Sequence, residues 1–175
     1  ASAYGATPVT ERSGHAFIRR TMIERSAALG AEISGHYFYG TLDGGDDGLY
    51  TACMLVDSLG IVDRPLSALR SDCPGIFMTS DLRVPAPPSD QEAMMDEVRH
   101  AFGNRPLSEI DGLRIDFDRG WVLVRRSVTE PALTVRAEGL SRAGLKGIVL
   151  TFCDRVKRLG PLVRSAYGGE REGNE

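Results

Sequence analysis

Two stretches of the chain carry different patterns of apolar residues, and these patterns predict different folds. In the first stretch, apolar residues recur at helical spacing from His15 to Leu29 and again from Leu49 to Leu59. The aromatic-rich segment EISGHYFYG, residues 32–40, lies between them and predicts a strand. Next comes the sequence DGGDDG, where Asp46 or Asp47 is expected to cap the second helix. This order of elements indicates part of an α/β domain.

The second stretch has the period of two that is typical of half-buried antiparallel strands. Three segments show it: LRIDFD at 113–118, WVLVRRS at 121–127 and ALTVRAE at 132–138. A capping-box pattern at Ser89 and Glu92 predicts one helix, and apolar spacing predicts another from Ser141 to Leu159. We therefore expect an antiparallel sheet that is covered by two helices.

The sequence between residues 64 and 88 is rich in proline and polar residues and separates the two stretches. The predicted fold class is α+β / α/β. A partial α/β domain with a mixed sheet and helices occupies residues 1–71, a small antiparallel domain follows at 72–165, and a disordered tail at 166–175. Because the chain starts at Ala1 with no helix or strand start signal, we expect a piece of a longer protein.

Composition narrows the possible functions. The 175 residues are 42% hydrophobic and carry a net charge of −3, which gives no overall attraction for nucleic acid or an anionic membrane. No apolar run approaches the roughly 18 residues of a membrane span. The three cysteines are odd in number and include no C-x-x-C pair, which argues against a disulfide framework or a zinc site and favours a cytoplasmic location. We expect no nucleic acid, no membrane and no metal bound by this chain.

Glu32, Ser34 and His36 form the first candidate site. On a strand, side chains two residues apart share a face, so these three would project together. A carboxylate can accept hydrogen bonds from neighbouring hydroxyls, a hydroxyl can donate or accept, and an imidazole can move a proton near neutral pH. The trio therefore suits a sugar, and a polar strand face in solvent is the alternative.

A second candidate site lies between two predicted strands. Arg125 offers a forked cation, Ser127 and Thr129 offer hydroxyl donors, and a loop broken by Pro131 can present backbone amides to an anion. These are the parts of a phosphate-binding loop. An ordinary polar hairpin connection is the alternative.

Three motifs occur in the order that is typical of one enzyme family. SGHAFIRR at 13–20, GAEISGHYFYG with DGGDDGLYTACMLVDSL at 30–59, and WVLVRRSVTEPALTVRAE at 121–138 carry the similarity. The chain resembles the C-terminal part of the α-D-phosphohexomutases, in the phosphomannomutase/phosphoglucomutase group. The first two motifs correspond to that family's domain 3, and the third corresponds to the phosphate loop of domain 4.

The resemblance implies a reversible transfer of phosphate between the 1- and 6-positions of a hexose phosphate, through a bisphosphorylated sugar. Glu32 and Ser34, together with His36, would read the sugar. Arg125, Ser127 and Thr129 would hold the phosphate that is not reacting, with Val128 at the loop position where the family has asparagine. His36 and His15 are the candidates for proton handling.

The chain also departs from the family pattern, because it has neither a T-A-S-H-N-P serine loop nor a D-G-D-G-D-R metal loop. In the family these loops belong to domains 1 and 2 and provide the phosphoserine and its magnesium. The expected partners are therefore a hexose phosphate and the N-terminal domains 1 and 2, and we expect this chain alone to bind without turnover and to bind no cofactor itself. A stand-alone phosphosugar-binding module and a purely structural interaction domain are the alternatives. The choice between mannose and glucose stays open.

Overall fold

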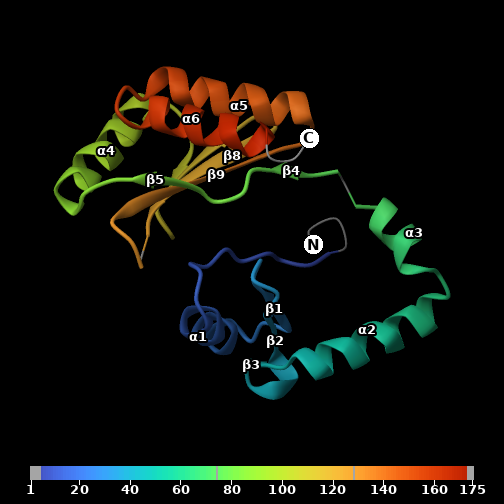
Figure 1. The fold of residues 1–175 in the computed structure, drawn as a ribbon. Helices are drawn as coiled ribbons and strands as arrows, with labels where there is room; N and C mark the ends of the chain where they lie inside the picture. The colour runs from blue at the N-terminus through green and yellow to red at the C-terminus, as the bar shows by residue number, and fades with distance from the viewer. Residues whose placement is uncertain (1–4, 74, 128, 173–175) are drawn as a thin grey trace. The chain divides into compact units, whose positions relative to one another are not determined.

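The computed structural model describes residues 5–73, 75–127 and 129–172. The chain divides into two compact units, which we call unit 1 (residues 1–73) and unit 2 (residues 74–175) (Figure 1). The sequence patterns had placed this boundary after residue 71. Both units combine helices with antiparallel strands, which confirms the predicted fold class.

Unit 1 is built from short strands and helices. Its elements are α1 (His15–Arg25), β1 (Leu29–Ala31), β2 (Tyr37–Tyr39), the 3-10 turn η2 (Gly40–Leu42), β3 (Gly45–Asp46), α2 (Gly48–Val62) and α3 (Leu66–Ser71). The strands pair in the order β1-β2-β3, and both pairs are antiparallel because short connections join consecutive strands.

Helix α1 packs closely against the small sheet. Met22 on α1 and Phe38 on β2 are the buried hydrophobic residues among those described in unit 1. A Cβ atom at Gly30 would lie 2.7 Å from the Met22 sulfur, so glycine on β1 permits this close approach. This contact holds helix α1 close to strand β1.

Two predictions for unit 1 were wrong in detail. Helix α1 ends at Arg25 and not at Leu29, because Ser26 adopts a left-handed conformation with φ of 49° and closes the helix. The predicted strand at 32–40 begins only at Tyr37. Residues 32–36 form the hairpin loop instead, in which the Gly35 amide donates to the Glu32 carbonyl at 3.0 Å and Gly35 has a φ of 92°.

Unit 2 contains the larger sheet. Its elements are β4 (Phe77–Met78), β5 (Leu82–Pro85), α4 (Pro88–Ala101), β6 (Leu107–Ser108), β7 (Leu113–Phe117), β8 (Gly120–Arg126), β9 (Ala132–Gly139), α5 (Arg142–Arg155) and α6 (Leu159–Glu172). The strand order is β4-β9-β8-β7-β6, and β5 also pairs with β9. The three alternating segments of the sequence thus form the central strands β7, β8 and β9.

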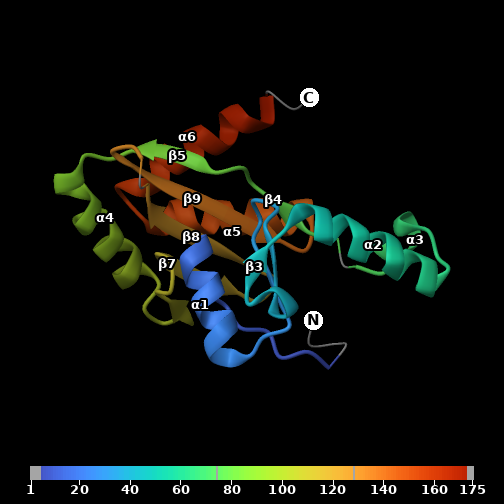
Figure 2. The same cartoon turned by 90° about the horizontal axis from the view of Figure 1, so that it is seen from below.

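One face of this sheet carries the core of unit 2. Val122 and Val124 on β8 are almost fully buried, while Trp121, Leu123 and Arg125 alternate with them and point to the opposite face. Figure 1 shows α5 and α6 above the strands, and Figure 2, viewed from below, shows β8 and β9 in front of α5. The helices therefore cover the apolar face.

The C-terminal part of unit 2 differs from the prediction. The helix expected from Ser141 to Leu159 ends at Arg155, and a further helix, α6, follows. Helix α6 continues through residues 166–172, where a disordered tail was predicted. The physical reason is that Leu159 and Val163 are buried in the core and that Ala166 and Tyr167 pack against it. Three helices, not two, accompany this sheet.

Candidate functional site

The predicted sugar-binding residues of unit 1 lie on the β1–β2 hairpin loop and not on a strand face. The loop is closed by the Glu32 amide, which donates to the His36 carbonyl at 2.9 Å. Glu32, Ser34 and His36 are therefore brought together by a tight turn, and the period-two argument that grouped them was wrong. The structure nevertheless places all three on one short loop.

The carboxylate of Glu32 is held on both of its oxygens. The Ser34 hydroxyl donates to Oε2 at 2.8 Å, and the backbone amide of Gly14 donates to Oε1 at 3.1 Å. Gly14 precedes the first turn of α1, so this contact links the hairpin loop to the start of the helix. A carboxylate oxygen has two acceptor sites, which leaves each of these oxygens able to accept a further hydrogen bond.

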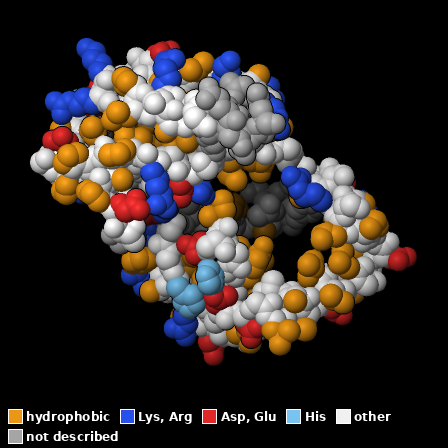
Figure 3. Space-filling model, in the orientation of Figure 1, with side chains coloured by type: hydrophobic (Ala, Val, Ile, Leu, Met, Phe, Trp, Pro, Cys, Tyr) orange, Lys and Arg blue, Asp and Glu red, His pale blue; other side chains and the backbone are white. Residues whose placement is uncertain are grey.

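The two candidate histidines meet at a single carboxylate, that of Asp46. The His36 Nδ1 atom lies 2.5 Å from Asp46 Oδ2, and the His15 Nε2 atom lies 3.7 Å from the same oxygen. Figure 3 shows a pale blue group of histidine side chains beside acidic side chains. Sequence patterns had assigned Asp46 only a possible capping role, and the helix cap is in fact Asp47, which accepts from the Tyr50 amide at 2.8 Å.

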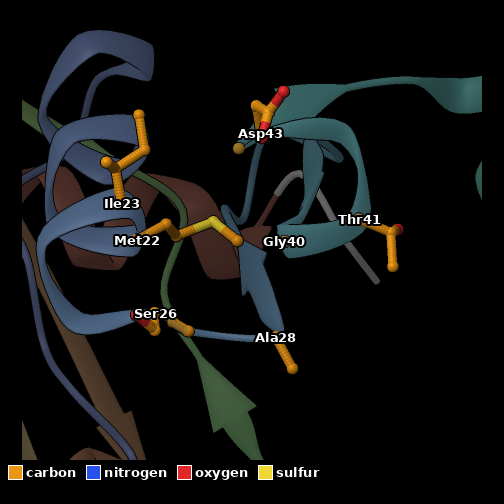
Figure 4. A pocket seen from close by; sticks show the side chains of 9 residues that line it. Met22, Ile23, Ser26, Ala28, Gly40, Thr41 and Asp43 are labelled. Carbon is orange, nitrogen blue, oxygen red and sulfur yellow. The ribbon is translucent and has the colours of Figure 1, made fainter.

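Two hollows border this part of unit 1. A cavity of about 740 Å³ lies between the segment 6–13, α1 and β1, and includes Glu32 in its lining. Glu11, at the same cavity, accepts from the Thr21 hydroxyl, and this hydrogen bond lowers the pKa of the Glu11 carboxyl. A second pocket, of about 480 Å³, lies between Met22 and Ile23 of α1 and the turn η2 (Figure 4). Its lining contains none of the predicted site residues.

The predicted phosphate-binding residues lie at the connection between β8 and β9. Arg125 is the second-to-last residue of strand β8, opposite Thr134 on β9. The Ser127 amide donates to the Ala132 carbonyl at 2.9 Å, which closes the connection. Thr129 is exposed in the bend that follows. Val128 lies outside the described residues.

Arg125 is surrounded by acidic side chains that the sequence patterns did not reveal. One of its guanidinium nitrogens lies 3.5 Å from Asp111, and another lies 4.0 Å from Asp81. Asp81 also pairs with Arg136 at the shorter distance of 2.9 Å. The two carboxylates come from loops that are distant in sequence, so only the folded sheet brings them to Arg125. They hold its guanidinium at the end of β8.

Neither a metal cluster nor a membrane-spanning helix was found in the described parts of the chain. No group of three or more His, Cys, Asp or Glu residues there is arranged to hold a metal ion. No helix in these ranges is long and apolar enough to cross a membrane.

Comparison with protein-family models decides the family. Residues 1–76 match the model of the alpha/beta/alpha domain III of phosphoglucomutase/phosphomannomutase, and residues 82–155 match the model of its C-terminal domain. The chain belongs to this family. Its two matched regions correspond to units 1 and 2 and follow one another in the order that the sequence motifs indicated, which confirms the resemblance to the C-terminal part of the phosphohexomutases.

Relatives of this chain carry the names of phosphohexomutases and are longer than this chain. The phosphomannomutase/phosphoglucomutase of Pseudomonas aeruginosa is 31% identical over 159 residues, which are 89% of this chain and 34% of the relative. The phosphoglucomutase of Neisseria meningitidis is 33% identical over 154 residues, 85% of this chain and 33% of the relative. A probable phosphoglucosamine mutase of Methanosarcina barkeri is 31% identical over 140 residues, 78% and 31% of the two chains. The chain thus spans about a third of the length of these relatives.

A solved structure in the same family has a similar fold. The phosphoglucomutase/phosphomannomutase family protein from Burkholderia thailandensis superposes with a TM-score of 0.78 at 32% identity, and the match covers 91% of this chain and 34% of that one. The relatives are mutases, so the comparisons do not favour a stand-alone binding module.

Proposed function

We propose that this chain supplies the sugar-reading and phosphate-holding loops of a phosphohexomutase. The enzyme would interconvert hexose 1-phosphate and hexose 6-phosphate through a bisphosphorylated sugar. The main support for the proposal is the loop of unit 1, where hydrogen bonds fix the side chains of Glu32, Ser34 and His36. The chain that contains this loop belongs to the phosphohexomutase family.

Glu32 and Ser34 read hydroxyl groups of the sugar. Because the Gly14 amide and the Ser34 hydroxyl hold one oxygen each, the Glu32 carboxylate keeps its orientation before a ligand arrives. Its remaining acceptor sites suit two neighbouring hydroxyls, which a hexose presents in either of the orientations that the reaction requires. His36 and His15 handle the proton of the attacking or leaving hydroxyl.

Arg125 holds the phosphate group that is not reacting. Its ion pairs with Asp111 and Asp81, at 3.5 and 4.0 Å, are long, so a phosphate oxygen at normal hydrogen-bond distance would contact the guanidinium more closely than either carboxylate. Ser127 and Thr129 add hydroxyl donors. This chain has Val128 where the family has an asparagine, so backbone amides of the loop would donate to the phosphate in place of that side chain. Positioning of this kind is the main protein contribution to phosphoryl transfer.

The remaining catalytic parts belong to the rest of a longer enzyme. The chain has no serine-loop or metal-loop motif, so phosphoserine and magnesium would be contributed by domains 1 and 2. The exposed apolar surface of α2 supports the view that unit 1 works against further polypeptide. The three unpaired cysteines fit a cytoplasmic location.

A titration of the whole chain with glucose 1-phosphate and mannose 1-phosphate tests the proposal. In amide NMR spectra we expect shifts at the loops of Glu32 and Arg125. Arg125→Ala should weaken affinity at least about tenfold, because a charge-assisted contact contributes roughly 1.5 to 3 kcal/mol.

Arg126→Ala is the matched control, because Arg126 is the next residue and pairs with Glu92. Its affinity should stay within about twofold of the wild-type value. Absence of shifts with both sugars would reject the phosphosugar proposal. Equal losses in the two variants would remove Arg125 from the site, and conversion of glucose 1-phosphate by this chain alone would show that the other domains are not needed.

A further inference from the structure

The proposed function uses the guanidinium of Arg125 and leaves open what sets its direction. The Oδ2 atom of Asp111 lies 3.5 Å from Arg125 Nη1. Asp81 approaches the other terminal nitrogen only to 4.0 Å and pairs with Arg136 at the shorter distance of 2.9 Å. The side chain of Asp111 is 27% exposed and that of Arg125 is 36% exposed, so both are partly sheltered from solvent. Asp111 is therefore the acid that acts mainly on Arg125.

We propose that Asp111 is a positioning residue that orders the Arg125 guanidinium before a phosphate arrives. The carboxylate attracts one end of the guanidinium, at Nη1, and leaves the other N–H groups to donate to the ligand. The inference rests on the proposed function for the identity of that ligand as a phosphate group. The order of the ligand-free side chain depends on unit 2 alone.

The turn that carries Asp111 lies directly against strand β8 because a glycine follows the acid. Gly112 has a φ of 94°, and a Cβ atom there would lie 2.4 Å from the Val124 carbonyl oxygen and 2.8 Å from the Cβ atom of Arg125. Leu113, the next residue, pairs with Val124 in the register of β7 and β8. The Asp-Gly sequence thus brings the Asp111 carboxylate to the position of Arg125, and a larger residue at 112 would push the turn away.

The backbone of Arg125 is also held from the side of β9. Thr134 is its partner in the register of β8 and β9, and the Thr134 hydroxyl donates to the Arg125 carbonyl at 3.3 Å. With the main chain held on both sides, the long side chain is the part of Arg125 that can still move. An arginine side chain loses rotamer freedom when it binds a ligand. A charged partner that orders the side chain in advance removes part of that loss.

The contact between Asp111 and Arg125 is long enough to leave the arginine available. Its 3.5 Å exceeds the usual hydrogen-bond distance of about 2.7 to 3.2 Å, so phosphate oxygens can approach the guanidinium more closely than the acid does. Asp111 also repels a phosphate. This repulsion acts over a longer distance beside solvent, where salt screens it. We therefore expect ordering of Arg125 to outweigh the repulsion.

Nitrogen-15 relaxation of the Arg125 Nε–H group in the ligand-free whole chain tests the ordering. In the wild type we expect an order parameter above about 0.6, the level below which a group counts as flexible, and in Asp111→Ala a value below it. Asp111→Asn keeps an acceptor oxygen without the charge and should give an intermediate value, which matters if the alanine variant fails to fold. Asp118→Ala is the matched control, because it removes an exposed acid from the turn at the other end of β7. It should leave Arg125 unchanged.

Titration with inorganic phosphate and with glucose 1-phosphate measures the consequence for binding. Asp111→Ala should weaken both affinities roughly three- to tenfold, the range expected for ordering one long side chain. In the Arg125→Ala background the same substitution should change affinity by less than about twofold, because Asp111 acts through Arg125. Tighter phosphate binding by Asp111→Ala would show that repulsion dominates and would overturn the proposal. An equal loss in the Arg125→Ala background, or an unchanged order parameter, would overturn it as well.

The two measurements separate the role of Asp111 from the proposed function. Ordering of Arg125 that depends on Asp111, in a chain that does not bind glucose 1-phosphate, would reject the proposed function alone. Binding of glucose 1-phosphate that needs Arg125 and is unaffected by Asp111→Ala would reject the role of Asp111 alone.

Discussion

The two units bury their apolar residues to very different extents. Among the residues that the structure describes, 23 of the 25 buried hydrophobic residues belong to unit 2 and two belong to unit 1. The large exposed hydrophobic residues show the reverse, with 13 of 18 in unit 1. Because burial of apolar area is the main favourable contribution to folding, unit 2 has its own core and unit 1 does not.

Helix α2 shows the difference most clearly. None of its 15 residues is buried, and Leu49, Val56 and Ile61 are 77%, 70% and 78% exposed. Figure 3 shows orange side chains at the surface of the part that Figure 1 labels α2. A helix that is apolar on several sides is normally covered by other structure. The carboxylates and imidazoles of unit 1 therefore lie in a small framework that buries little apolar surface among the described residues.

The largest expected effect comes from separating the units. A polypeptide of residues 74–175 should keep a cooperative thermal transition, because its core is internal to that range. A polypeptide of residues 1–73 should show no such transition, because two buried residues cannot offset the loss of conformational entropy. Circular dichroism and the dispersion of amide NMR signals measure both results. A cooperative transition in residues 1–73 would contradict the comparison.

Single substitutions should show the same contrast on a smaller scale. Phe152 is fully buried and stacks on Phe102 with ring centres 5.8 Å apart, so Phe152→Ala should lower the free energy of unfolding of unit 2 by about 3–5 kcal/mol. Ile61→Ala, at the exposed end of α2, should change stability by less than about 0.5 kcal/mol. Urea titration of the whole chain measures both variants. A comparable loss at Ile61 would mean that α2 is packed against another surface in solution.

Sequence patterns predicted unit 2 better than unit 1, and the reason is physical. Alternation in β7 and β8 reports directly on which residues face the core, because Leu113, Ile115, Val122 and Val124 are all buried. In unit 1 the helical spacing of apolar residues predicted α2. The described parts of the chain bury none of the α2 residues. A periodic pattern predicts an element, and it does not identify what covers that element.

The candidate site shows a similar division. Residue types and spacing pointed to Glu32, Ser34 and His36, although the strand that was expected to align them is a loop. Asp46 was missed, because its place beside His36 depends on pairing between β2 and β3. The pair of adjacent acids, Asp46 and Asp47, did indicate a further contact. Only one of them is needed to cap the helix, and Asp47 is that cap, so Asp46 is left to make a different contact. In α6, the spacing of Leu159, Val163 and Tyr167 also indicated a helix that the polar tail concealed.

Alanine substitutions at Gly120 and Gly60 have the smallest expected effects on stability. The two changes should have opposite signs, which makes them a sensitive test of the comparison between the units. At Gly120 on β8, a Cβ atom would lie 2.0 Å from the Glu138 carbonyl oxygen and 2.6 Å from Ile148. The neighbouring strand cannot move away without breaking its pairing, so Gly120→Ala should destabilise unit 2 by about 1–3 kcal/mol. At Gly60 on α2, nothing lies within 4 Å of the added atom.

Gly60→Ala should therefore make the helix more favourable by roughly 0.5–1 kcal/mol, since alanine loses less backbone freedom than glycine on forming a helix. The measurements are the urea midpoint for Gly120→Ala and the helical circular dichroism signal on heating for Gly60→Ala. If Gly60→Ala instead lowered the helical signal, the open space around α2 would have to be filled in solution, most simply by a second copy of the chain. In that case helicity should depend on protein concentration, whereas a lone exposed helix would give the same signal at every dilution.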